Sequence, residues 1–106
     1  MTIKELKQLS KEDFLKIPNT TEKLYSDLSN SKSGYIDVIR TKDGLVWSGY
    51  TDAFGEGLSL IINKTFNFWQ TSIIKEINWK NGYFNTLNSK YLFIFEEEDN
   101  NDSTNC

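Results

Sequence analysis

The sequence predicts an α+β domain, in which short N-terminal helices pack on a small antiparallel β-barrel of five or six strands. Apolar residues follow helical spacing over residues 2–30 and alternate over residues 34–96, which marks a change from helix to strand. Two dipeptides are strong hairpin signals, Asp43-Gly44 and Asn81-Gly82. Short strands joined by tight turns are typical of a small closed barrel, and closure would hide the edges of these apolar strands.

The length of 106 residues predicts one domain over residues 1–96, followed by an acidic polar tail over residues 97–106. The single cysteine, Cys106, has no partner for an internal disulfide, and we assign it no role. The charged N-terminus lacks the apolar core of a signal peptide, and no apolar run is long enough to span a bilayer. We therefore expect a cytoplasmic protein without a membrane partner.

Short helices are expected in the first segment because N-cap residues precede its apolar positions. Thr2, with Glu5 three residues later, matches the capping box that begins a helix. The N-cap pattern recurs before two later helices, at Ser10 and at Thr20 or Thr21.

Strands are expected in the second segment over residues 35–40, 45–51, 58–62, 71–77, 83–87 and 91–95. Gly49 lies inside the second of these strands, where a glycine usually marks a bend or a bulge. Residues 71–77 also fit a helical turn, but we favour a strand. Residues 63–69 are expected to form a polar and aromatic connection.

The stretch YIDVIRTKDGLVWSGYTDAF, followed by GLSLII, resembles the first motif of Sm-like proteins. In that family an Asp-Gly turn is followed by four residues and a bending glycine, and Asp43-Gly44 with Gly49 is similar to this pattern. The resemblance covers about residues 34–79 and implies an SH3-like or Sm-like barrel. Asp52 is present, but the asparagine with which the family also binds RNA bases is missing, so we take the fold and not the RNA binding from it.

The sequence contains no histidine, which removes the commonest general base and metal ligand. Asp52 and Glu56 flank a Gly-rich turn, but their spacing matches no metal-binding loop, and we expect them to be solvated. We therefore expect no metal, no cofactor and no enzymatic activity. Nucleic acid is a disfavoured partner because the net charge is -3 and Arg40 is the only arginine.

Aromatic residues are the most informative feature: the chain has three Trp, five Tyr and seven Phe. Apart from Phe14 and Tyr25, all of them lie between Tyr35 and Phe95. A barrel of this size cannot hold so many large rings, so some are expected to face outward and bind a partner. The predicted partner-binding residues are Trp47, Tyr50, Phe66, Phe68 and Trp69.

A second candidate site would bind an anion. Cationic and hydroxyl side chains could hold the phosphate of a nucleotide-like ligand if the strands bring them together. The candidate contacts are Arg40, Lys42, Thr71, Ser72 and Lys75.

These observations favour a small, non-enzymatic interaction or inhibitor protein that docks an aromatic surface on a protein partner. The Lys-, Asn- and Ile-rich, Arg-poor composition suggests a bacterial or phage origin, and compact acidic proteins of that origin are often anti-defence or immunity proteins. The alternatives are a protein that binds or sequesters a nucleotide or other small molecule and, with less support, an Sm-like RNA-binding ring. A homo-oligomer is left open.

Overall fold

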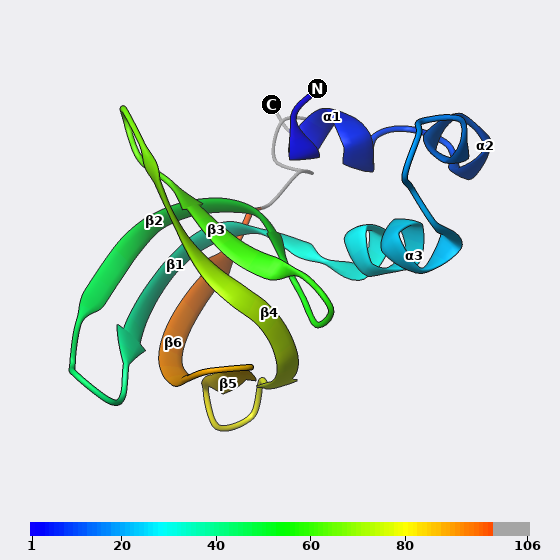
Figure 1. Ribbon diagram of the computed structural model, residues 1–106. Helices are drawn as coiled ribbons and strands as arrows, with labels where there is room; N and C mark the ends of the chain where they lie inside the picture. The colour runs from blue at the N-terminus through cyan, green and yellow to red at the C-terminus, as the bar shows by residue number, and fades with distance from the viewer. Residues whose placement is uncertain (99–106) are drawn as a thin grey trace, which may run out of the picture.

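The computed structural model describes residues 1–98 and confirms the predicted α+β architecture, with N-terminal helices packed on a closed antiparallel barrel (Figure 1). The helices of this part of the chain are α1 (Ile3–Lys7), α2 (Lys11–Leu15) and α3 (Glu22–Asn30). The strands are β1 (Lys32–Arg40), β2 (Val46–Phe54), β3 (Ser59–Asn63), β4 (Phe68–Asn78), β5 (Tyr83–Thr86) and β6 (Lys90–Glu97). The strands follow one another around the barrel in chain order, and β6 closes it by pairing with β1.

The helices begin at the N-caps that the sequence predicts. Thr2 and Glu5 form the reciprocal capping box, with the Thr2 amide donating to Glu5 Oε1 at 2.8 Å. Ser10 caps α2, and Thr21 rather than Thr20 caps α3. The helices are attached to the barrel by a second, smaller core of buried side chains, which contains Phe14, Leu28 and Ala53.

The barrel interior is filled by aliphatic side chains and aromatic rings. Its buried residues are Ile36, Val38, Phe54, Leu60, Ile62, Ile74, Phe84 and Tyr91. Phe54 lies among several rings in edge-on or tilted contacts with centroid distances of 5.0 to 5.5 Å. Phe84 stacks on Tyr91 at 4.9 Å. Close packing of this kind holds the barrel rigid around the surfaces it presents.

Gly49, where the sequence predicts a bend, lies where β2 approaches β3. A Cβ atom at Gly49 would lie 2.6 Å from Cγ2 of Ile62, so only glycine permits this approach. Residues 71–77 lie within β4 and are a strand, as favoured from the sequence. None of the helices among residues 1–98 is long and apolar enough to cross a membrane.

The predicted connection over residues 63–69 is wrong in its extent. The Lys64 amide donates to the Asn67 carbonyl at 2.8 Å and closes a tight turn, so only residues 64–67 lie between the strands. Phe68 is therefore paired with Asn63 in the ladder between β3 and β4. Of the acidic tail predicted over residues 97–106, Glu97 belongs to β6. Residues 99–106, including Cys106, lie outside the described part of the chain.

Candidate functional site

The candidate site is the hairpin that joins β3 and β4, which we call the aromatic hairpin and define as residues 63–69. It projects beyond the barrel wall, as the green tip at the upper left of Figure 1 shows. Phe66, in the turn, is 96% exposed, and Phe68, at the start of β4, is 60% exposed. The structure thus brings two of the five predicted partner-binding residues together at one projecting tip.

Trp47 and Trp69 lie together at the base of this hairpin and are half-buried. Their rings stack at 4.0 Å with an interplanar angle of 16°, and both pack against the barrel core. Trp69 also meets the buried Tyr91 ring edge-on at 5.8 Å. On the hairpin itself, Lys64 Nζ donates to the Ser48 carbonyl of β2 at 3.3 Å. These contacts connect the hairpin to β2 and to the interior, so the two tryptophans support the tip rather than extend it.

Tyr50 pairs with Asn63 at the base of the aromatic hairpin, but its side chain faces α1 and the end of β6 and not the tip. Its half-buried side chain lines a cavity of about 270 Å³, together with Lys7 of α1 and Glu98. The Tyr50 hydroxyl donates a hydrogen bond to Glu98 Oε1. Burial, reinforced by the Glu98 carboxylate, raises the pKa of Tyr50 to about 12. Tyr50 is therefore a bridge between β2 and the end of β6.

The candidate anion contacts are divided between two sides of the barrel. Arg40 ends β1, which pairs with β2 and β6, whereas Thr71, Ser72 and Lys75 belong to β4, which pairs with β3 and β5. Lys42 lies exposed in the turn after β1. The structure does not bring these five residues into one site.

Three of the polar candidates, Arg40, Thr71 and Ser72, have local partners. Arg40 Nη2 lies 2.9 Å from Asp43 Oδ2, and its guanidinium lies 5.0 Å from the Trp47 ring centroid. The Asp43 carboxylate raises the pKa of Arg40, and Arg40 in turn lowers the pKa of Asp43. Thr71 Oγ1 accepts from the Leu60 amide at 3.0 Å and donates to the Ser72 carbonyl at 2.7 Å.

The two carboxylates at the Gly-rich turn also have separate partners. Glu56 accepts a hydrogen bond from the Ile77 backbone amide at 2.8 Å, and Asp52 accepts one from Asn63 Nδ2 at 3.5 Å. Within residues 1–98, no three Cys, Asp or Glu side chains gather into a cluster that could hold a metal ion.

Sequence reasoning missed a second exposed surface, on the outside of β1, β2 and β6. It carries large apolar side chains: Tyr35, Ile39, Val46, Leu92 and Ile94. The signal was present, because the run YLFIF in β6 is apolar at both alternating positions and cannot bury both.

No family model matches the chain, and comparison with curated proteins and with solved structures finds no match.

Proposed function

We propose that this chain is a non-enzymatic protein-binding module, of the anti-defence or immunity type found in bacteria and phages, and that it binds its partner through the aromatic hairpin. The observation that carries the proposal is the 96% exposure of Phe66 at a projecting tip. A fully hydrated phenylalanine ring gains nothing from folding, since the hydrophobic effect rewards only area removed from water. Its burial in a partner would supply that gain.

The architecture of the hairpin supports binding with little loss of conformational freedom. The turn at residues 64–67 is closed by its own backbone hydrogen bond, and the Trp47–Trp69 stack supports its base. A rigid aromatic anchor loses less entropy on binding than a mobile loop does. The fitting partner surface is an apolar pocket wide enough for the two phenylalanine rings.

The alternative of a nucleotide-like ligand has no comparable observation in its favour. Its candidate contacts lie on non-adjacent strands, and the only arginine is already paired with Asp43. The protein-binding proposal therefore ranks first.

The test is affinity capture from a lysate of the source organism with three baits. These are the wild-type chain, the double variant Phe66→Ala plus Phe68→Ala, and Leu87→Ala as a matched control. Leu87 is 69% exposed in the turn between β5 and β6, so its removal changes a similar exposed area elsewhere. We expect the wild type and the control to recover the same partner and the double variant to lose it.

Two outcomes would contradict the proposal. One is equal recovery of the partner by the double variant, provided all three baits show the same thermal midpoint. The other is binding of the wild type to lipid vesicles, lost in the double variant, with no protein captured; that result would assign the tip to a membrane surface.

A further inference from the structure

The outer face of β1, β2 and β6 does not show the polar residues expected on the solvent-exposed side of a sheet. Outward positions of such strands are normally polar, because only the inner face meets the core. Here Ile94 is 75% exposed within β6, and four further large apolar side chains share the face: Tyr35, Ile39, Val46 and Leu92. An exposed patch of this kind marks an interaction surface.

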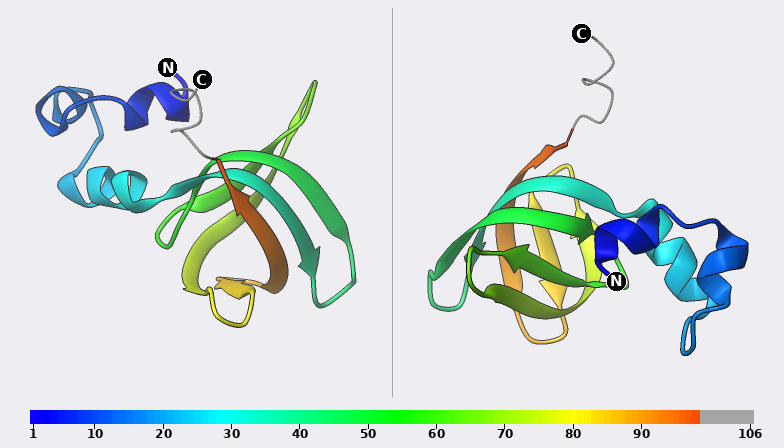
Figure 2. Two further views of the ribbon diagram at one scale, coloured as in Figure 1. Left: turned by 180° about the vertical axis from the view of Figure 1, so that it is seen from behind. Right: turned by 90° about the horizontal axis from the view of Figure 1, so that it is seen from above.

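The strand register joins three of these side chains and Tyr83 of β5 into a row around the barrel wall. Val46 of β2 lies opposite Ile39 of β1, Ile39 opposite Leu92 of β6, and Leu92 opposite Tyr83 of β5. We call these four residues the apolar row; at the usual strand spacing it is about 15 Å long. The helices lie beside one end of the barrel and leave the row uncovered (Figure 2).

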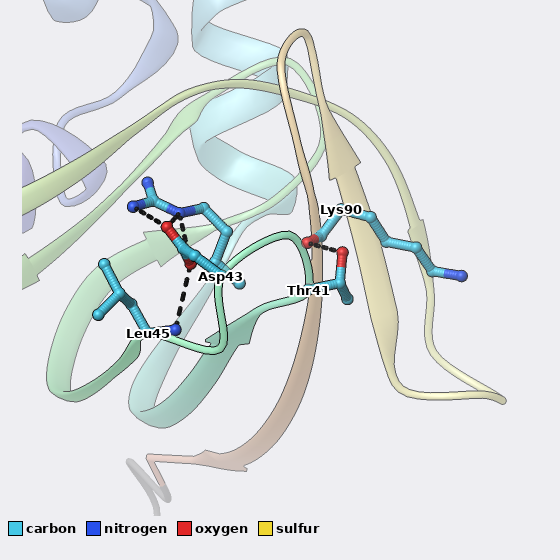
Figure 3. A network of polar contacts seen from close by, with 5 residues as sticks. Thr41, Asp43, Leu45 and Lys90 are labelled. Carbon is cyan, nitrogen blue, oxygen red and sulfur yellow. Dashed lines mark hydrogen bonds and ion pairs between the residues drawn. The ribbon is translucent and has the colours of Figure 1, made fainter.

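Charges of opposite sign lie on the two sides of the apolar row. Asp37, the next outward position on β1, is on one side, and Glu96 of β6 lies farther in the same direction. Lys90 of β6 is on the other side, with its Nζ 4.3 Å from the Tyr83 ring centroid. Figure 3 shows Lys90 extending away from the hairpin in which Asp43 lies, so Lys90 is available for another carboxylate.

We infer that a second copy of this chain docks on this face, about a two-fold axis that lies along the apolar row. Such a rotation places the apolar row on its own copy and lays each strand over the same strand of the other subunit. The register then brings Asp37 of one subunit to the side of the row on which Lys90 of the other lies, one strand spacing, or ~5 Å, away from it, within reach of the long lysine side chain. This is the self-complementary arrangement of an isologous dimer, in which two sheets stack about 10 Å apart. The aromatic hairpin belongs to β3 and β4, which contribute nothing to the row, so this inference does not depend on the proposed function.

The first test is sedimentation velocity over a concentration series. We expect the wild type to pass from monomer to dimer and Ile39→Lys to stay monomeric at every concentration. Ile73→Lys is the matched control, because Ile73 is also an exposed isoleucine but lies on β4, away from the row. It should dimerise as the wild type does, and both variants should keep the wild-type circular dichroism spectrum.

The second test exchanges charges across the proposed interface. Asp37→Lys and Lys90→Glu each place like charges next to one another across the interface, and each should raise the dimer dissociation constant at least about tenfold. The variant with both changes pairs opposite charges again and should recover most of the wild-type affinity. If a single substitution weakened the dimer only by disturbing its own subunit, the second substitution would not restore the affinity.

Three results would overturn the inference. They are a wild type that stays monomeric throughout, a dimer that Ile39→Lys leaves intact, and a double exchange no better than the single ones. A monomeric wild type whose heterologous partner is lost in Ile39→Lys would assign the face to a different protein.

Discussion

The phenylalanines of the barrel interior and those of the aromatic hairpin are the same residue type in opposite environments. Phe84 has no exposed surface, and three other rings lie within 6 Å of it, those of Phe54, Tyr91 and Phe93. Phe66 is almost wholly exposed on a turn. The interior rings stabilise the fold, whereas the hairpin rings contribute to it little or nothing. A large number of aromatic residues can therefore serve the core or an exposed surface, and only the position of each ring in the fold distinguishes the two roles.

The largest expected effect is the loss of stability when an interior ring is removed. Phe84→Ala removes a ring from a close-packed interior and leaves a cavity, which should lower the free energy of unfolding by about 3–5 kcal/mol. Urea denaturation followed by tryptophan fluorescence measures this loss. Phe66→Ala is the matched control, because it deletes the same atoms from an exposed turn and should change stability by less than about 0.5 kcal/mol.

Equal losses in the two variants would show that the hairpin ring is buried in solution. An unchanged stability of Phe84→Ala would show that the barrel interior is loosely packed. Either result would contradict the division of the rings into two classes.

A smaller effect is expected at the boundary between the two classes, where Trp47 stacks on Trp69. A double-mutant cycle with Trp47→Ala, Trp69→Ala and the double variant isolates the energy of this pair. We expect a coupling energy of about 0.5–1.5 kcal/mol, as found for stacked rings beyond their buried area. Because the stack lies under the hairpin, disruption should also weaken capture of the partner.

Strict additivity of the two substitutions would contradict this role for the stack. Stability measured by urea denaturation gives the coupling, and the same four proteins used as baits give its effect on binding. If the two substitutions are coupled in stability but the variants still capture the partner, the tryptophans stabilise the fold and do not contribute to binding.

The elements of the fold were predictable because their signals are local. The Thr2–Glu5 capping box and the Asp43-Gly44 turn each depend on a few adjacent residues, and both are present as expected. The turn at residues 64–67 was missed in its extent, because Phe68 and Trp69 are apolar and suit a strand or a buried loop equally well. Its length is fixed by pairing with β3, which no local pattern reports.

The candidate site was predictable only in part. Alternation along β2 places Trp47 and Val46 on opposite faces, but it does not say which face is inside. The structure turns Trp47 inward onto Trp69 and leaves Val46 exposed. In β6 both faces are apolar, so the pattern could not distinguish Leu92 and Ile94 on the outside from the residues between them.

The smallest expected effect concerns Tyr50, a ring that is neither interior nor projecting. Burial and the hydrogen bond to Glu98 raise its pKa to about 12 in the folded protein. A tyrosine in the unfolded chain ionises near pH 10. The unfolded state therefore releases this proton first as the pH rises. The stability that Tyr50 contributes is fully present below about pH 10 and is lost as the pH rises towards about 12.

Denaturation curves at a series of pH values between about 9 and 12 test this expectation. Lysines ionise in the same range, so the informative quantity is the difference between the wild type and Tyr50→Phe. The wild type should lose stability more steeply with rising pH than the variant, and ultraviolet absorbance should show one fewer late-ionising tyrosine in Tyr50→Phe. Parallel loss in both proteins would mean that water reaches the Tyr50 hydroxyl freely, and that the link between β2 and the end of β6 is open in solution.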